Sequence, residues 1–412
     1  MIFSQDLLTK FRNSEQDFTR KSPLSFPHLI LYFLNFCKNS YQDELDHFFT
    51  ILEDSKFLFR KVSKAALSQA RAKLDAKVFQ YLIQKSQEFI EKNFPLETWQ
   101  GFRLFAIDGS TLYLNQNTET LDYFGFQTNQ HNKKIAMARL SQCFDVLNGL
   151  TQDIQLSPYS TGERSLFQLH CKQLPQDSLV LLDRGYPSYL LFHEVLQQNQ
   201  NFVARTPIDF NKDVKAFYES NQEDQLTTFP LPQGLSGRKD LPQELSVRLI
   251  KVQLDNETEI LVTSLIDSKH YTLSIFQDLY SKRWPVEEDY KKIKSSIQVE
   301  NFSGKSVHSI YQDVYAKVLS KNITVALMNP LKEEVEEKNK SKKHAYTMNL
   351  NHALSKMKHS IIRLLTGQSI QECLESLHKL WTKTLEPIRK GRKYYRIRKW
   401  ENRFPINCKP LC

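Results

Sequence analysis

The sequence has few cysteines and no long hydrophobic run. Six cysteines are scattered through 412 residues, and no two of them form a C-x-x-C pair. This spacing argues against a zinc site or a disulfide framework and favours a reducing compartment such as the cytoplasm. The longest apolar run, residues 29–37, is interrupted by Asn35 and is far shorter than the roughly 20 residues that span a bilayer. The N-terminal residues carry acidic side chains and no long apolar core, so we expect no signal peptide and no membrane partner.

Acidic residues are also fewer than basic ones. The chain has 46 Asp and Glu against 56 Lys and Arg, which gives a formal net charge of +10. A basic balance favours a polyanionic partner, although it says nothing about the fold. Because 40% of the residues are hydrophobic and 25% are charged, the composition is ordinary for a folded protein of two or three domains.

Residues 1 to about 95 show the apolar spacing of helices. Ser63 is placed to cap a helix that continues as KAALSQARAKL, a basic segment with many small residues. Such a helix suits close approach to DNA, and it also suits an ordinary packed bundle. In the first interpretation these polar side chains touch phosphates or bases: Lys64, Gln69, Arg71 and Lys73.

From Gly101 onwards the pattern changes to strands followed by helices. The apolar strands 102–107 and 179–182 end at Asp108 and Asp183, and helices and further strands follow, which predicts an α/β core with at least partly parallel strands. Residues 206–258 contain four prolines and alternating apolar residues, which indicates a β-rich insertion. The charged run 332–343 is typical of a solvated loop, and residues 344–386 are expected to be helical.

Two acids at strand ends and one on a later helix are the candidate catalytic and metal-binding residues. Functional groups gather where the strands of an α/β sheet end, so Asp108 and Asp183 are expected to converge there with Glu287. Three converging carboxylates need a cation, and hard oxygen ligands select Mg²⁺ or Mn²⁺. Two such ions can promote phosphodiester displacement. Taken singly, each aspartate also fits a turn, and these nearby acids are rivals: Asp122, Asp145, Asp153 and Glu288.

Residues 280–294 combine an aromatic hydroxyl, two cations and a carboxylate. If the segment is helical, Tyr280, Arg283, Glu287 and Lys294 share one narrow face. This stripe suits a metal ion with phosphate oxygens. The alternative is a solvated face with i,i+4 ion pairs. Pro285 marks either the first turn of a new helix or a kink.

These stretches together resemble a known family. IDGSTLYL around Asp108, LLDRGYPSY around Asp183 and the spacing Tyr-x2-Arg-x3-Glu-x6-Lys from Tyr280 to Lys294 look like the three signatures of DDE transposases. The third signature has the spacing of the insertion sequence 4 family, the order is the same, and all four of its residues are present. The resemblance covers most of the chain, including LSQARAKL, the β-rich insertion and a basic C-terminal tail.

The resemblance implies a set of roles for these residues. Asp108, Asp183 and Glu287 are implied as the ligands of two metal ions, Mg²⁺ or Mn²⁺. The implied contacts to phosphates at the transposon end are Tyr280, Arg283 and Lys294. Hydrolysis would free a 3′-hydroxyl, which would then attack target DNA, and because two ends must be brought together a dimer on DNA is expected.

One feature of the family is absent from the expected place. Some members stack a flipped base on a Trp of the insertion, whereas the four Trp of this chain lie outside residues 206–258. The aromatic residues that could substitute there are Phe210, Tyr218 and Phe229.

The C-terminal stretch 389–400 interleaves cations with aromatic residues, which suits DNA backbone and exposed bases. Arg392, Lys393 and Arg396 are therefore candidate DNA contacts. The alternative is a disordered basic tail with affinity for any polyanion.

We therefore expect an α/β fold with an RNase H-like catalytic core at 101–328, interrupted by the β-rich insertion at 206–258. A helical N-terminal DNA-binding domain (1–95) would precede it, and a helical C-terminal region with a basic tail (329–412) would follow. The expected function is cut-and-paste DNA transposition in the bacterial cytoplasm, associated with the nucleoid. Its expected partners are terminal inverted repeats and target DNA, both double-stranded. The alternatives are a repressor-like or domesticated DNA-binding relative without cleavage activity, and a nuclease that does not join strands.

Overall fold

The computed structural model describes residues 1–36, 40–128, 130, 132–253 and 258–388. The chain forms two compact units, and both are assembled from separate stretches of sequence. The helical unit comprises residues 1–94, 112–138 and 291–412, and the sheet unit comprises 95–111 and 139–290. This division groups residues that pack together, even where they are distant in the sequence. The domain boundaries expected at 95, 101 and 328 are a different kind of division and stay predictions.

Three elements have residues in both units, and the others fall within one unit. The three shared elements are β1 (Arg103–Tyr113), β3 (Lys134–Asp145) and α11 (Pro285–Ser295). The remaining elements of the sheet unit are β4 (Leu150–Pro158), α7 (Glu163–Cys171), β5 (Ser178–Leu182), α8 (Tyr189–Gln197), β6 (Asn201–Thr206), α9 (Lys212–Glu219), β7 (Asp224–Pro230), η1 (Gln233–Leu235), β8 (Glu244–Gln253), β9 (Thr258–Thr263) and α10 (Ile275–Ser281).

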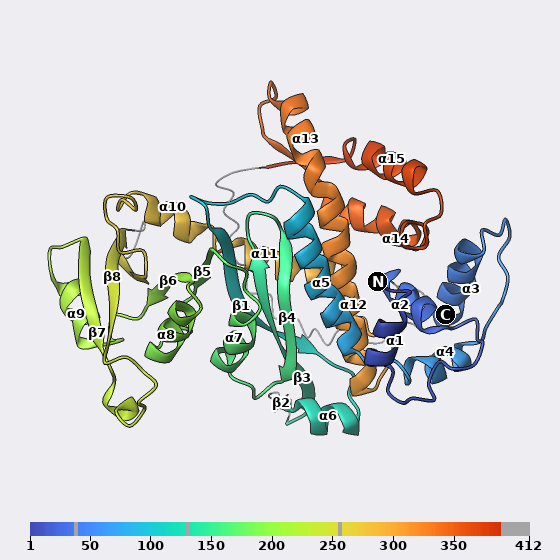
Figure 1. The fold of residues 1–412 in the computed structure, drawn as a ribbon, viewed down its shortest axis with the longest axis horizontal. Helices are drawn as coiled ribbons and strands as arrows, with labels where there is room; N and C mark the ends of the chain where they lie inside the picture. Colours follow the sequence, from blue (N-terminus) through green and yellow to red (C-terminus); the bar gives the residue numbers. More distant parts are fainter. Residues whose placement is uncertain (37–39, 129, 131, 254–257, 389–412) are drawn as a thin grey trace. The chain divides into compact units, whose positions relative to one another are not determined.

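The sheet of this unit has the strand order β3-β1-β5-β6-β9-β8-β7, and β4 pairs with β3 (Figure 1). The β1–β5 and β5–β6 pairs are parallel, which confirms the expected parallel strands, and β9 runs antiparallel to β6. The strands β7 and β8 of the expected insertion continue this same sheet, because β8 pairs with β9. The insertion also contains the helix α9, which the alternation of its apolar residues did not predict.

Each face of the central strands is covered by its own hydrophobic core. Side chains alternate across a strand, so Phe105 and Ile107 of β1 join a core that includes Phe167 of α7 and Phe192 of α8. On the opposite face, Leu104 packs with side chains of α10, including Phe276, Leu279 and Tyr280. The strands are therefore apolar on both faces, which is typical of buried parallel strands.

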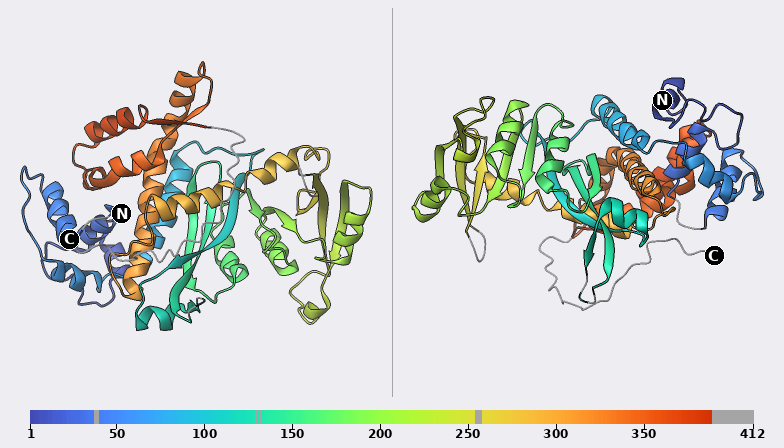
Figure 2. Two further views of the ribbon diagram at one scale, coloured as in Figure 1. Left: turned by 180° about the vertical axis from the view of Figure 1, so that it is seen from behind. Right: turned by 90° about the horizontal axis from the view of Figure 1, so that it is seen from below.

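The helical unit is built around one long helix. Its elements are α1 (Gln5–Phe11), α2 (Phe26–Leu34), α3 (Tyr41–Leu52), α4 (Lys64–Arg71), α5 (Lys77–Asn93), α6 (Thr118–Phe124), β2 (Phe126–Thr128), α12 (Val307–Met328), η2 (Asn329–Leu331), α13 (Lys332–Asn339), β10 (Tyr346–Met348), α14 (Leu350–Thr366), α15 (Ile370–Trp381) and β11 (Leu385–Pro387). The 22-residue helix α12 is buried on nearly all sides, and it packs against α5, α2 and α14 (Figure 2). Ser320 of α12 donates a hydrogen bond to the Leu34 carbonyl of α2.

Local sequence signals account for several boundaries and fail at others. Ser63 caps α4 as predicted, because its hydroxyl accepts a hydrogen bond from the Ala66 amide. The charged run expected to be a loop is instead the helix α13, where Val335 is buried against the unit and Lys338 pairs with Glu334. Tertiary burial of one apolar residue and i,i+4 pairing thus stabilise a helix that its polar composition concealed.

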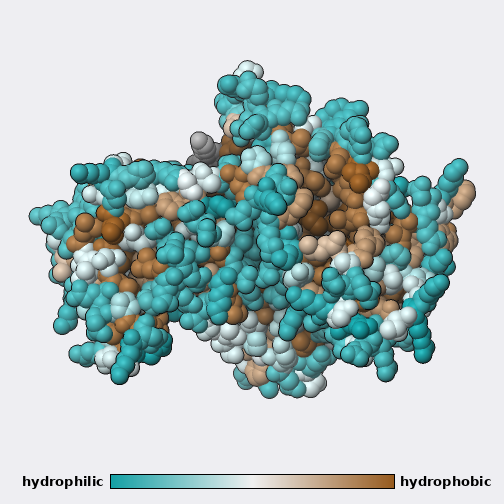
Figure 3. All heavy atoms as spheres, viewed as in Figure 1, coloured by the Kyte–Doolittle hydropathy of each residue, from teal (hydrophilic) through white to brown (hydrophobic). Residues whose placement is uncertain are grey.

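The visible face of the molecule is dominated by hydrophilic side chains, with brown hydrophobic patches over the region of α12 and α14 (Figure 3). Within the described residues, no helix combines the length and the apolar character needed to cross a membrane.

Candidate active site

Asp108 and Asp183 occupy neighbouring positions at one edge of the parallel strands. The last residues paired between β1 and β5 are Ile107 and Leu182, so the two aspartates follow directly on adjacent strands. Adjacent strands lie about 4.8 Å apart. The register thus places the two aspartates side by side, and the convergence of all three acids stays a prediction. β1 itself continues past Asp108 to Tyr113, so Asp108 marks the end of the pairing and not the end of the strand.

The same row continues onto a third strand. Leu182 of β5 pairs with Ala204 of β6, which places Arg205 beside Asp183. Ile107, Leu182 and Ala204 belong to the core on the α7 and α8 face. Because side chains alternate, Asp108, Asp183 and Arg205 project to the opposite face, the one that α10 covers.

Two tyrosine hydroxyls join the following helices to this row. Tyr280 of α10 donates a hydrogen bond to the Leu182 carbonyl at 3.3 Å, next to Asp183. Tyr290 of α11 donates to the Asp108 carbonyl at 2.7 Å. The expected DNA contact of Tyr280 stays a prediction; in the structure its ring is buried in the core under the sheet.

Glu287 is delivered by the first turn of α11. Pro285 is the first residue of this helix, so it begins a new helix and does not kink a continuous one. Nη2 of Arg283 donates to Oε1 of Glu287 at 3.0 Å. Arg283 is only 2% exposed, and within the described residues its Nε and Nη1 are buried without a hydrogen-bond partner. Its guanidinium also lies 5.0 Å from the ring of Trp284, which is exposed.

The two aspartates have opposite electrostatic environments. Burial raises the pKa of Asp108 to about 6, and the carboxylates of Glu287 and Glu163 add to the rise, against the lowering effect of the Gly109 amide and Arg283. Burial also acts to raise the pKa of Asp183, but the Arg184 amide and the guanidinium groups of Arg283 and Arg205 outweigh it, so that pKa is lowered. Perturbed carboxyl pKa values in one cluster are typical of functional sites.

The candidate ligand set of Asp108, Asp183 and Glu287 has the chemistry that a hard divalent cation prefers. It consists of carboxylates alone; burial is the main cause of the raised pKa of Asp108, and a cation would oppose the smaller rise that the Glu287 and Glu163 carboxylates add. Within the described residues, however, no three His, Cys, Asp or Glu side chains lie close enough to enclose a metal ion. Arg283 on Glu287 and Arg205 on Asp183 supply the positive charge in this arrangement.

Other predicted DNA-binding residues lie in the helical unit or outside the described residues. Lys294 is near the end of α11, where burial lowers its pKa and the Glu300 carboxylate opposes that effect. Lys73 is exposed just beyond α4. Arg392, Lys393 and Arg396 lie outside the described residues. The roles of all five in DNA binding stay predictions.

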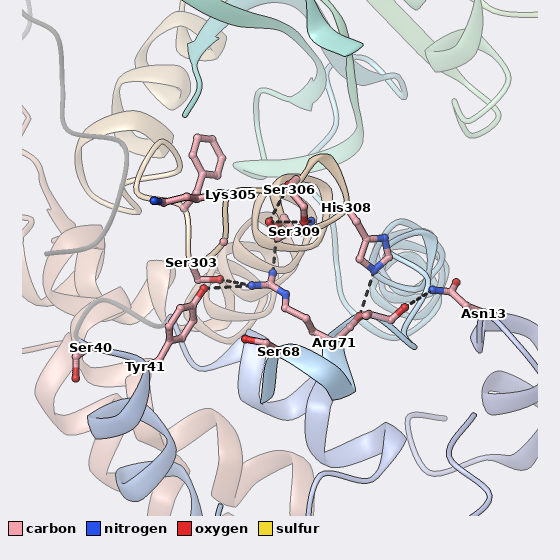
Figure 4. A pocket seen from close by; sticks show the side chains of 13 residues that line it. Asn13, Ser40, Tyr41, Ser68, Arg71, Ser303, Lys305, Ser306, His308 and Ser309 are labelled. Carbon is pink, nitrogen blue, oxygen red and sulfur yellow. Dashed lines mark hydrogen bonds between the residues drawn. The ribbon is translucent and has the colours of Figure 1, made fainter. Parts of the chain in front are cut away.

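Arg71 is buried, with its guanidinium directed inwards from α4 (Figure 4). It borders a cavity of about 790 Å³ that is also lined by the loop before α12. Nε donates to Gln312 at 3.0 Å, Nη1 donates to Tyr41 and Ser303, and Nη2 reaches Asp313 at 3.4 Å. These contacts match the packed-bundle interpretation of α4, and the DNA contact of Arg71 stays a prediction.

Sequence reasoning missed two residues of the site, Arg205 and Tyr290. Arg205 carries a similar signal, since it is the first charged residue after the apolar stretch 202–204 within β6. Tyr290 had no comparable signal, because its importance depends on which carbonyl its hydroxyl reaches. Among the insertion aromatics, Phe210 and Phe229 pack against each other at 5.8 Å beside the core, whereas Tyr218 is exposed.

Comparison with known proteins gives concordant matches. The family described as Transposase DDE domain matches residues 99–323. Transposase InsG for insertion sequence element IS4 of Escherichia coli (strain K12) is 23% identical over 279 residues, which are 67% of this chain and 63% of that protein. Putative transposase InsZ of the same strain is 24% identical over 143 residues, 34% of this chain and 48% of that protein. The chain therefore spans less than two thirds of the length of either relative.

A solved structure of piggyBac transposase, in a synaptic complex with hairpin DNA, is similar with a TM-score of 0.41 and 11% identity. The similarity covers 91% of this chain and 80% of that one. The family match covers more than half of the 412 residues, and it contains Asp108, Asp183 and Glu287. The predicted resemblance to insertion sequence 4 transposases is confirmed by the InsG match. The chain belongs to the transposase DDE domain family.

Proposed function

We propose that this chain is a DNA transposase that cuts at transposon ends and joins the freed 3′-hydroxyl to target DNA. The observation that supports it most is the adjacency of Asp108 and Asp183 in one row, next to a helix that carries Glu287 and is joined to that row by Tyr290. The strand order and the two covered faces support an RNase H-like core for the sheet unit.

Asp108, Asp183 and Glu287 would hold the divalent cations. When bound, a pair of Mg²⁺ or Mn²⁺ ions activates a water or 3′-hydroxyl and stabilises the leaving oxygen of a phosphodiester. Arg283 would bind a DNA phosphate, since a guanidinium presents its donors as a planar fork. Its Nε and Nη1, which lack partners within the described residues, are the available donors.

The proposed partners follow from this chemistry. Double-stranded terminal repeats and target DNA suit the net charge of +10. Two transposon ends must be joined to one target, so the active form would be a dimer on DNA. Such a protein would act in the bacterial cytoplasm, at the nucleoid.

The test is cleavage of a plasmid that bears the element ends, with Mg²⁺ or Mn²⁺ and with chelator. Glu287→Gln is expected to abolish cleavage and to leave end binding intact. Glu288→Gln is the matched control, because Glu288 is adjacent on α11 but exposed, and it should cleave normally. If Glu287→Gln cleaves as fast as the unmodified protein, Glu287 has no part in the chemistry.

The same assay separates the alternatives. A repressor-like relative would bind the ends without metal-dependent cleavage in any form of the protein. A nuclease would cleave and yield no product joined to target DNA. Both results would contradict the proposed transposition.

A further inference from the structure

We propose that Arg205, held in turn by Glu259, is a positioning residue that fixes one carboxylate oxygen of Asp183 and presents the other to a divalent cation. This inference rests on the proposed function, because it gives Arg205 a part in the assembly of that same site.

The pairing of β5 with β6 places Arg205 next to Asp183. Leu182 and Ala204 are the last paired residues of β5 and β6, so Asp183 and Arg205 are direct neighbours on parallel strands. On its other side β6 pairs antiparallel with β9, with Thr206 opposite Ile260, and Glu259 is the next residue of β9. Three charged residues on three adjacent strands therefore meet on a rigid sheet.

The contacts of Arg205 are asymmetric. Its Nε and Nη2 both donate to Oδ1 of Asp183, at 3.2 and 2.8 Å. Its Nη1 donates to Oε1 of Glu259. Among the described residues, the hydrogen bonds of Arg205 to Asp183 therefore go to Oδ1 and none goes to Oδ2.

Pairing on two sides restrains the Arg205 side chain. The side chains of Arg205 and Asp183 are 27% and 32% exposed, and Glu259 is only 9% exposed. A guanidinium that bridges two carboxylates from neighbouring strands cannot rotate without breaking one of the pairs. A ligand carboxylate that is itself hydrogen-bonded is the usual arrangement around protein metal sites.

Asp108 provides the internal contrast. Its carboxylate accepts the Gly109 amide at 2.9 Å, and among the described residues no arginine donates a hydrogen bond to it. Arg205 thus gives Asp183 a side-chain support that orients its carboxylate before any cation arrives.

The experiment measures Mn²⁺ binding to the DNA-free protein through the electron paramagnetic resonance signal of free Mn²⁺. Arg205→Lys keeps the charge and removes the fork, and it is expected to weaken Mn²⁺ binding roughly 10–100-fold. End-DNA affinity should stay within about twofold, and cleavage should recover at high Mn²⁺. Arg238→Lys is the matched control, since Arg238 makes a similar two-bond pair with Asp240 but on an exposed loop.

A purely structural pair would give a different result. Mn²⁺ affinity of folded Arg205→Lys within threefold of the unmodified protein would overturn the proposal, and so would a cleavage defect that high Mn²⁺ does not rescue. Where Arg205→Lys fails to fold, Glu259→Gln decides, because it loosens the guanidinium and leaves Asp183 paired; the same loss of Mn²⁺ affinity is expected. If the unmodified protein neither binds Mn²⁺ nor cleaves, the proposed function fails, and that outcome is separate from a failure of Arg205 alone.

Discussion

The hydroxyl of Tyr290 donates a 2.7 Å hydrogen bond to the backbone carbonyl of Asp108, and Tyr290 is fully enclosed. Glu287 lies one turn earlier on the same helix, so this bond fixes where the third acid sits along β1. A second contact on α11 has the same effect, because Asp289 accepts a hydrogen bond from Gln142 of β3 at 2.7 Å. Backbone and buried polar contacts of α11 thus contribute to the alignment of the acids.

Tyr290→Phe tests this alignment. The variant removes the shorter of two side-chain hydrogen bonds to the Asp108 carbonyl, since Ser141 donates to it at 3.5 Å, and this loss should lower the free energy of unfolding by about 1–2 kcal/mol. Small misplacements of reacting groups are costly, so end cleavage should fall roughly 10–100-fold while end binding is retained. Denaturant unfolding and plasmid cleavage measure the two effects. Tyr218→Phe, at an exposed position, should change neither quantity. Normal cleavage by a folded Tyr290→Phe protein would show that the bond does not align the acids.

Arg283→Ala should weaken binding of end DNA. The side chain carries two buried donors without partners within the described residues, and these are suited to one phosphate. Loss of one phosphate contact should reduce the slope of log affinity against log salt by about 1. Fluorescence anisotropy of an end duplex at several salt concentrations gives the slope. Arg238→Ala, at an exposed site, is the comparison, and an unchanged slope for Arg283→Ala would contradict a phosphate contact.

Asp108→Asn should make the metal-free protein more stable at neutral pH. The folded pKa of about 6 lies above the ordinary value of 3.8, so between these two pH values the folded state holds a proton that the unfolded chain has released. That contribution to stability is complete below pH 3.8 and is lost as the pH rises through about 6. The unmodified protein should therefore gain about 1–3 kcal/mol relative to Asp108→Asn between pH 7.5 and pH 4.

Denaturant unfolding in chelator at a series of pH values measures this difference. Asp240→Asn is the control of opposite sign, because pairing with Arg238 lowers the pKa of Asp240. A stability difference between the unmodified protein and Asp108→Asn that does not change with pH would contradict the raised pKa.

Arg71→Ala and Lys73→Ala should separate packing from DNA binding at α4. Arg71 is buried against Asp313, and removing one partner of a buried pair costs about 3–5 kcal/mol. Lys73 is exposed, so its variant should unfold normally and reduce the salt slope of DNA binding by about 1. Thermal unfolding and anisotropy together distinguish the two. A fully stable Arg71→Ala protein with a reduced slope would favour the DNA-contact interpretation of Arg71.

The sequence predicted the positions of site residues where a local pattern of residues also determines their place in the fold. Apolar runs followed by an acid predicted that Asp108 and Asp183 lie close together, and both directly follow the last paired residues of β1 and β5, because parallel strands are apolar until they leave the core. The spacing from Tyr280 to Lys294 predicted a helix at Glu287; Pro285 left a new helix and a kink open, and the structure shows it as the first residue of α11. Both signals depend on residues close together in the chain.

The features that the sequence did not predict depend on contacts between residues that are distant in the sequence. The pairing of Arg205 with Asp183 follows from strand register, which the composition of β6 does not specify. Burial of Arg71 depends on α12, more than two hundred residues away. The helix α13 was hidden by its charge, since only its packing shows which residues are enclosed. In each case the residues that determine the structure by packing or pairing are far away in the sequence.

The passage of residues 112–138 out of the sheet unit and back has a practical consequence for protein expression. No single uninterrupted fragment contains the whole sheet unit and nothing else. A truncated gene product from 95 to 290 would still carry Phe124, which in the intact chain is enclosed and packs 5.7 Å from Tyr311. Without that aromatic neighbour, such a fragment would expose hydrophobic surface to solvent and is expected to precipitate, so the sheet unit would have to be produced by circular permutation or with a short linker in place of residues 112–138.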